Sequence, residues 1–191
     1  PVNAVEATMI NNETVVYVGV GDFNLLSVTG GVYRWDDSLG WEQMGLADDV
    51  VNILAINPDN PDIIFAAIAQ PADGYPIYRS VDAGETWEQL PFEIWGNLAN
   101  IIIDPNNTDR ILVSVGDQLY ESLDNGNTWQ QIYQGEVGEE FNTLHIPKEN
   151  STSENLARSG TQGGNLYLGT SKGLFINIFN NQRIYLPLIN K

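Results

Sequence analysis

The sequence predicts an all-β protein built from four repeated units, and three observations lead to this expectation. An eight-residue phrase occurs twice, 42 positions apart, as Ser80-Val-Asp-Ala-Gly-Glu-Thr-Trp87 and Ser122-Leu-Asp-Asn-Gly-Asn-Thr-Trp129. Runs rich in β-branched and aromatic residues lie between turn residues, and no long helical pattern is visible. The 191 residues suffice for one domain with a sizeable core. Because a period of about 40 to 50 residues is typical of propeller blades, we expect a four-bladed β-propeller of four-stranded antiparallel blades.

The repeated phrase itself predicts a tight β-hairpin. Its Asp can accept hydrogen bonds from nearby backbone N–H groups, its Gly permits positive φ, and its Thr starts the returning strand before a Trp that packs. The positions concerned are Ser80, Asp82, Gly84, Thr86 and Trp87 in the first copy, and Ser122, Asp124, Gly126, Thr128 and Trp129 in the second.

Both copies match the pattern Ser/Thr-x-Asp-x-Gly-x-Thr-Trp at every fixed position. The phrase therefore resembles the Asp-box, or BNR-like, repeat of sialidase-like, sortilin-like and related β-propellers. In those families the box joins the third and fourth strands of a blade, its Asp holds the turn, and its Trp packs into the stack of blades. The resemblance implies that these residues are architectural in this chain and not catalytic.

The segments around the two boxes supply the other strands of the central units. A first strand ends before Pro58 in one unit and before Pro105 in the other. The second and third strands are expected at Ile63 to Ile68 and Pro76 to Ser80, and at Ile111 to Val115 and Gln118 to Ser122. Each unit therefore has four expected strands.

The same four-strand pattern can be laid over both ends of the chain. The front strands are expected at 4–10, 14–20, 31–35 and 41–44, with a shortened box between Trp35 and Trp41, whose Trp41 serves as the closing Trp. The back strands are expected at 141–146, 165–169, 173–178 and 183–189, with a turn at Asn180-Asn181. Equivalent aromatics are Tyr33, Tyr78, Tyr120 and Phe175. We expect one domain with blades at about 1–47, 48–93, 94–137 and 138–191, and a long loop over 149–164.

Composition excludes several classes of partner. The net charge is −17, with 25 acidic and only 8 basic residues, so nucleic acid and anionic membranes are not expected partners. The absence of cysteine excludes disulfides and thiol chemistry, and no apolar run is long enough to insert into a membrane. The start at Pro1 and the resemblance together favour an extracellular or cell-surface location after removal of a signal peptide. Asn12, Asn106 and Asn150 begin glycosylation-type sequons.

Catalytic and metal sites are not expected. The arginines, Arg34, Arg79, Arg110, Arg158 and Arg183, read as repeat residues rather than a substrate-binding cluster, and no catalytic motif accompanies the single histidine, His145. The acidic pairs Asp36-Asp37 and Asp48-Asp49 could offer oxygen ligands to calcium, but neither lies in a recognised calcium loop. No cofactor is therefore expected, with calcium as the only alternative left open.

The chain ends suggest the function. The last segment is apolar, and we expect Ile184, Tyr185, Leu186, Leu188 and Ile189 to make contacts between identical chains. The leading hypothesis is a non-enzymatic extracellular propeller that assembles into a filament, tube or surface lattice through terminal strands or blade edges.

Two other functions remain open at this stage. One is a glycan- or protein-binding module that uses exposed aromatics such as Phe23, Tyr75 and Trp95. The other is a fragment of a glycoside hydrolase that resembles the propellers of xyloglucan-cleaving enzymes. Whether the ring closes within one chain or by strand exchange also stays open.

Overall fold

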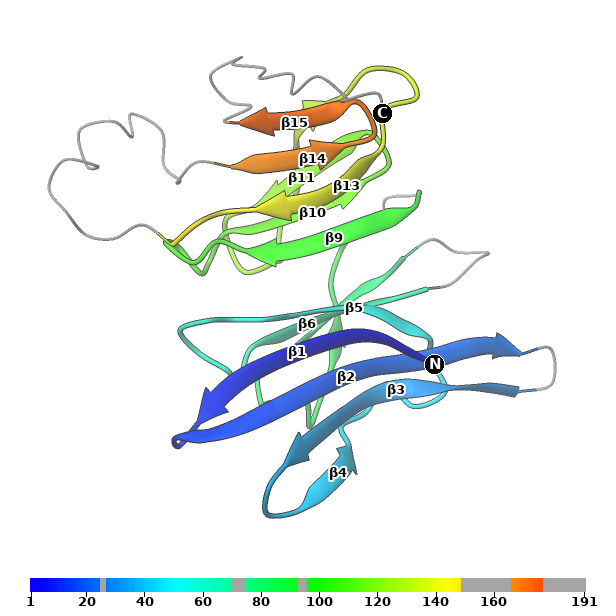
Figure 1. Cartoon of the computed structure of the whole chain (residues 1–191), viewed down its shortest axis with the longest axis vertical. Coiled ribbons are helices and arrows are strands. Elements are labelled where there is room, and N and C mark those ends of the chain that lie inside the picture. Colours follow the sequence, from blue (N-terminus) through cyan, green and yellow to red (C-terminus); the bar gives the residue numbers. More distant parts are fainter. Residues whose placement is uncertain (25–26, 70–74, 93–95, 149–165, 177–191) are drawn as a thin grey trace, which may run out of the picture. The chain divides into compact units, whose positions relative to one another are not determined.

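The computed structural model describes residues 1–24, 27–69, 75–92, 96–148 and 166–176, with the side chains of 23, 24, 27–29, 175 and 176 left aside. Within these ranges the chain forms fifteen β-strands and no helix, so the expected all-β class is confirmed (Figure 1). The chain divides into two compact units, Pro1–Asn97 and Leu98–Lys191. Each unit contains two antiparallel sheets, numbered here 1 to 4 in chain order.

Sheet 1 contains β1 (Val2–Ile10), β2 (Glu13–Asn24), β3 (Ser27–Asp36) and β4 (Gly40–Gln43), in that order. The strands β2 and β3 are longer than the sequence pattern suggests, because pairing continues through Gly21 and Gly30. A Cβ atom added to Gly30 would lie 1.9 Å from the carbonyl oxygen of Asp49. Only glycine can be accommodated so close to that carbonyl oxygen. The glycines, which ordinarily indicate a turn, therefore lie within the paired strands here.

Sheet 2 contains β5 (Val51–Ile56), β6 (Ile64–Ile68), β7 (Ile77–Ser80) and β8 (Glu88–Gln89), also in chain order. It packs on sheet 1 through one hydrophobic cluster that includes Tyr17 and Met44 from the first sheet and Leu54 and Ile64 from the second. The indole Nε1 of Trp87 donates a hydrogen bond to the carbonyl oxygen of Met44 at 2.7 Å. The two sheets of the first unit therefore share one core.

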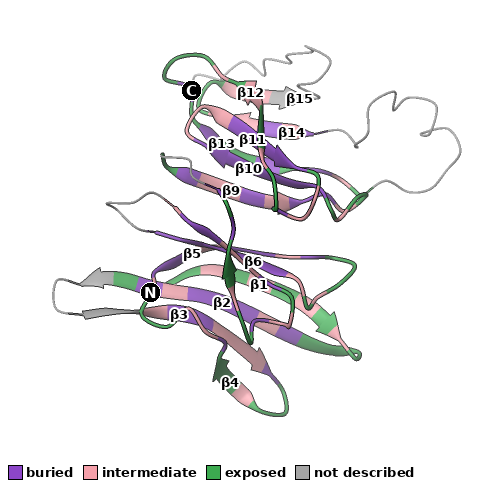
Figure 2. Ribbon diagram, turned by 180° about the vertical axis from the view of Figure 1, so that it is seen from behind, coloured by how far each residue is buried: buried purple, intermediate pink, exposed green. Residues whose placement is uncertain are grey.

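The second unit repeats this arrangement. Sheet 3 contains β9 (Leu98–Ile103), β10 (Ile111–Val115), β11 (Gln118–Ser122) and β12 (Gln130–Gln134), and sheet 4 contains β13 (Phe141–His145), β14 (Tyr167–Thr170) and β15 (Gly173–Ile176). A second hydrophobic cluster joins them. The strands β6 and β10, in the middle of their sheets, are buried along their whole length (Figure 2). The expected turn at Asn180-Asn181 and strand at 183–189 lie outside the described residues.

The strand registers show how the four sheets correspond. Tyr33, Tyr78, Tyr120 and Phe175 occupy the same place in their sheets, so their expected equivalence is confirmed. The rows are Val5–Val18–Tyr33, Leu54–Ala66–Tyr78, Ile101–Val113–Tyr120 and Leu144–Leu168–Phe175. We call the sheet face that carries this row the back face, and the opposite one the front face. In both units the front face of the first sheet packs on the back face of the second.

Candidate functional site: an exposed sheet face

The first box is closed by hydrogen bonds within eight residues. Ser80 Oγ donates to Asp82 Oδ1 at 2.7 Å and accepts from the backbone N–H of Gly84 at 2.8 Å. The Asp82 carboxylate accepts from the backbone N–H and the hydroxyl of Thr86, at 2.8 and 2.5 Å. These bonds, the Thr86 hydroxyl foremost, lower the pKa of Asp82 below its ordinary value of 3.8. Asp82 is therefore a structural carboxylate whose oxygens are occupied by its own turn.

The second box repeats these contacts. Asp124 accepts from the backbone N–H and hydroxyl of Thr128 at 2.8 and 2.7 Å, and Ser122 Oγ accepts from Gly126 N–H at 2.8 Å. The side-chain hydrogen bond from Thr128 is the largest cause of the lowered pKa of Asp124. Trp87 and Trp129 each donate to the carbonyl oxygen of the box glycine at 2.9 Å. The contacts are consistent with the architectural role that the Asp-box resemblance implies.

Sheet 1 contains a different turn from the one expected. Asp36 Oδ1 accepts from the backbone N–H groups of Ser38 and Leu39 at 2.9 and 2.8 Å, which closes a short β3–β4 hairpin. Trp41 then pairs with Trp35 inside the sheet and is 59% exposed. Its expected role as the closing Trp is wrong, because the shorter turn places it in a strand, whereas Trp87 follows the turn and bonds across to sheet 1.

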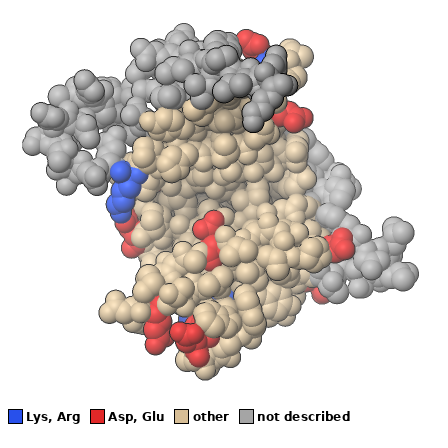
Figure 3. Space-filling model, viewed as in Figure 1, with Lys and Arg blue, Asp and Glu red and all other residues tan. Residues whose placement is uncertain are grey.

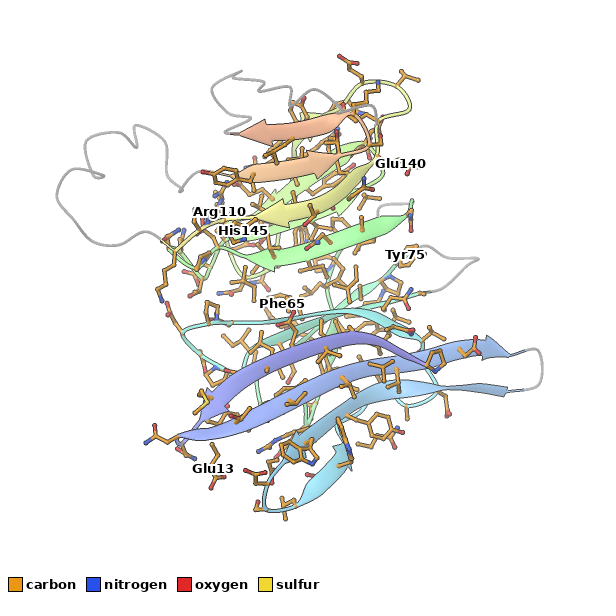
Figure 4. All side chains as sticks on the ribbon, viewed as in Figure 1. Glu13, Phe65, Tyr75, Arg110, Glu140 and His145 are labelled. Carbon is orange, nitrogen blue, oxygen red and sulfur yellow. The ribbon has the colours of Figure 1, made fainter. Side chains whose placement is uncertain are left out.

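The described arginines serve their own sheets. Arg34 pairs with Asp36, Arg79 with Glu88, and Arg110 with both Asp104 and Glu121. Arg110 is 2% exposed, at the entrance to β10 (Figure 4). Arg158 and Arg183 lie outside the described residues. The three described arginines thus bind carboxylates of the fold itself.

The other polar candidates divide by their surroundings. His145 is exposed at the end of β13, 6.3 Å from the Tyr167 ring centroid. Burial, and then the neighbouring charge of Asp48, raise the pKa of Asp49. Asp and Glu lie at several separate places on the face in Figure 3, and the described residues contain no group of three or more potential metal ligands. No long apolar helix that could span a membrane occurs in the described part of the chain.

The sequons also differ from one another. Asn12 is exposed at the tip of the β1–β2 hairpin with a φ of 66°. The amide of Asn106 instead donates to Asp104 Oδ1 at 3.1 Å and to the carbonyl oxygen of Pro147 at 2.9 Å. Asn150, the 149–164 loop, Trp95 and the Phe23 side chain lie outside the described residues, as do the expected assembly contacts Ile184, Tyr185, Leu186, Leu188 and Ile189. Tyr75 is only partly exposed.

The back face of sheet 1 is the feature that sequence reasoning missed. Along β1 the apolar side chains of Val5, Ala7 and Met9 are exposed, whereas the alternating Glu6 and Thr8 are half-buried against sheet 2. The hydrophobic pattern of this strand predicts the opposite, since apolar residues ordinarily face the core. Burial accordingly raises the pKa of Glu6. The alternation of apolar and polar residues along β1 was the available signal, because it indicates that the face carrying Val5 is covered by another surface.

Comparison with the other sheets shows how unusual this exposure is. Val5 is 60% exposed, while its equivalents Leu54, Ile101 and Leu144 are between 3% and 5% exposed. The same face holds a cross-strand pair, Trp35 and Trp41, next to Tyr33. The back face of sheet 1 comprises Val2, Val5, Ala7, Met9, Thr14, Val16, Val18, Val20, Gly31, Tyr33, Trp35, Trp41 and Gln43. None of these residues is charged, and the same face of β2 continues beyond Val20 to the exposed Asp22.

A cavity opens on this face. It has a volume of about 420 Å³ and is lined by Val2, Val20, Tyr33 and Trp41 among others. Its walls come from all four strands of sheet 1 and from apolar side chains chiefly. Such a hollow can receive an apolar or aromatic group from a partner.

Comparison with known proteins shows the fold. No protein-family model and no curated protein sequence matches the chain. The structure is similar to a GH74 enzyme from Niastella koreensis, with TM-score 0.64, 18% identity and coverage of 92% of this chain and 28% of that one. An ancestral GH74 enzyme gives TM-score 0.67 and 22% identity over 98% of this chain and 24% of the other. YCF48 bound to D1 peptide gives TM-score 0.53 and 16% identity over 92% and 50%.

These neighbours are β-propellers, and the four antiparallel sheets make this chain an all-β protein with the fold of a four-bladed β-propeller. The chain spans about a quarter of the length of the GH74 enzymes and half of YCF48. At 16% to 22% identity the likeness concerns the fold alone. One fold carries many functions, so function has to be argued from the exposed face itself.

Proposed function

We propose that this chain is a non-enzymatic, extracellular structural subunit of the Asp-box type that assembles with copies of itself. The observation that carries the proposal is the back face of sheet 1, where Val5 is 60% exposed although its equivalents in the other sheets are buried. A contiguous apolar face of this kind is ordinarily covered by another protein surface. The apolar segment Ile184 to Ile189 remains a second predicted contact for the same assembly.

Charge constrains how the copies can meet. A net charge of −17 on every chain opposes self-association, so the contact has to exclude charge. The back face of sheet 1 meets this condition from Val2 to Gln43, because its acidic residue, Asp22, lies beyond Val20 at the far end of β2. The acidic composition also argues against nucleic acid and membrane partners. The YCF48 structure, which holds a bound peptide, is an example of a protein partner on a similar fold.

The native mass tests the proposal. Light scattering coupled to size-exclusion chromatography should show oligomers that grow with protein concentration, and added salt should favour them because it screens the repulsion between acidic chains. Val5→Arg should abolish the oligomers. Val81→Arg is the matched control, since Val81 is 61% exposed and lies in the first box turn instead of the back face. A wild-type chain that stays monomeric at every concentration and salt level contradicts the proposal.

The aromatic row favours a second candidate, a glycan-binding module. Tyr33, Trp35 and Trp41 lie side by side on the exposed face and could stack on sugar rings. Titration with β-glucan oligosaccharides, followed by tryptophan fluorescence, tests this reading. Saturable binding that Trp41→Ala removes supports it, whereas an unchanged signal in a protein that oligomerises leaves self-assembly as the function.

A further inference from the structure

We propose that the surface covering the back face of sheet 1 is the front face of sheet 4 in a second copy, so that chains join head to tail. This inference rests on the proposed function and names its partner surface. It follows from the internal repeat: within each unit a back face is covered by the front face of the preceding sheet. In the part of the chain that the structure describes, the back face of sheet 1 is exposed at Val5 and the front face of sheet 4 is exposed at Thr143 and His145.

The four front faces share a pattern at their second strand. A bulky residue and a small residue stand two positions apart on the same face in every sheet. The pairs are Tyr17 and Gly19, Phe65 and Ala67, Leu112 and Ser114, and Tyr167 and Gly169. Sheet 4 thus carries the same Tyr and Gly as sheet 1. The surface that fits the front face of sheet 1 is therefore a template for the surface that fits sheet 4.

Sheet 2 shows what that template contains. Val51 packs on Gly19 so closely that an added Cβ would lie 2.7 Å from Val51 Cγ1. The strand registers place Val2 in sheet 1 at the position of Val51 in sheet 2. Val51 is 0% exposed, and Val2 is 60% exposed. Val2 is therefore exposed where Val51 is covered. Its counterpart on the front face of sheet 4 is the position of Gly169, where the Thr143 methyl group lies 2.6 Å from the place of an added Cβ.

The tyrosine supports the same pairing. Tyr17 Oη donates to the carbonyl oxygen of Ala83 at 3.1 Å, across the contact between sheets 1 and 2. Tyr167 stands at the equivalent position and is partly exposed, beside exposed Thr143 and His145. In the assembled pair its hydroxyl would reach the β3–β4 turn of the next copy. No acidic residue belongs to this group of sheet 4, so the group adds no carboxylate to the contact.

A contact between two different faces of the same chain is heterologous. It produces a ring if successive rotations close and an open filament if they do not. Two back faces of sheet 1 meeting around a twofold axis would instead stop at a dimer. The head-to-tail arrangement requires the front face of sheet 4, whereas the twofold dimer does not use it. A substitution on that face therefore distinguishes the two arrangements.

Mixing two blocked variants tests the inference. Val5→Arg blocks the back face of sheet 1, and Thr143→Arg blocks the front face of sheet 4 at an exposed position. Each variant alone should be monomeric by native mass. An equimolar mixture should form a dimer of one copy of each and grow no further, because each variant retains the face that the other lacks. Val81→Arg should assemble like the wild-type chain, and thermal unfolding of every variant verifies folding.

The outcomes separate the inference from the proposed function. If Thr143→Arg assembles like the wild type while Val5→Arg is monomeric, self-assembly stands and the head-to-tail pairing is wrong. A mixture that remains monomeric also overturns the pairing. A monomeric wild-type chain refutes the proposed function itself. Because the chain has no cysteine, Val2→Cys and Thr143→Cys in separate chains provide a second readout, in which a disulfide between the copies supports the contact.

Discussion

Replacing Arg110 by isoleucine should be among the most damaging single changes in the second unit. Arg110 Nε binds Glu121 Oε1 at 2.7 Å, and its Nη1 binds Asp104 Oδ2 at 3.0 Å. Asp104 is 0% exposed and Glu121 is 8% exposed. Removing the guanidinium leaves two carboxylates buried without a cation, although Gln130 still donates to Glu121 Oε2 at 2.9 Å.

The magnitude follows from that stranded charge. Breaking a buried ion pair by removing one partner costs about 3–5 kcal/mol, whereas replacing the whole group by neutral side chains is often close to neutral. Sheet 2 shows two of the three positions in neutral form, while Arg79, which pairs with Glu88, stands at the position of Glu121. Asn57 and Ile63 stand there at the positions of Asp104 and Arg110, joined by the same backbone hydrogen bond at 2.9 Å. The triple variant Asp104→Asn, Arg110→Ile, Glu121→Gln should therefore be more stable than the single variant.

Thermal unfolding followed by circular dichroism measures the difference. At about 2–4 °C per kcal/mol for a chain of this size, Arg110→Ile should lower the Tm of the chain by about 6–20 °C. The triple variant should recover most of that loss. If the single and triple variants lose the same amount, the cost comes from lost packing around the arginine stem, and the argument from stranded charge is refuted.

Three further predictions concern smaller effects. Ala83 has a φ of 58° and matches Asn125 in the second box, so Ala83→Asn should raise the free energy of unfolding by about 0.5–1 kcal/mol, measured by urea denaturation. The pKa of Glu6 is raised by burial, so its ionisation costs stability as pH rises; Glu6→Gln should be more stable than wild type at neutral pH, and equal Tm values there would contradict this. The pKa of Asp82 is lowered, so its ionised carboxylate stabilises the fold above pH 3.8, and this stabilisation is lost as pH falls. Asp82→Asn should therefore flatten the acid side of a plot of Tm against pH, and an unchanged slope would contradict this prediction.

Local sequence determined much of the fold. The apolar runs at β6 and β10, which contain β-branched residues, favour buried strands. The box pattern determines each turn through hydrogen bonds between residues at most four positions apart. The equivalence of Tyr33, Tyr78 and Tyr120 could be read from spacing alone, since a repeat carries its register with it.

Features that depend on distant residues could not be read in this way. The partner of Trp87 is a carbonyl 43 positions earlier, which no local pattern indicates. Trp41 follows its glycine directly, whereas Trp87 follows the box glycine by three positions. Arg110 follows a polar loop, so nothing local shows that two carboxylates enclose it. The exposed back face of sheet 1 was missed because the apolar residues of β1 lead one to expect a buried face. Whether that face is buried depends on a second sheet that the local sequence does not specify.

The hydrogen bond from Trp87 to Met44 has a consequence for cooperativity. It joins the turn of sheet 2 to the residue that follows the last strand of sheet 1, while the shared hydrophobic cluster joins the same two sheets along their faces. A single sheet of this protein therefore lacks the contacts that its neighbour supplies. When stability arises mainly between neighbouring repeats, the smallest piece able to fold alone is a pair of neighbours. In this chain the pair of consecutive sheets, and not the single sheet, is the unit of folding and the smallest fragment that should survive limited proteolysis.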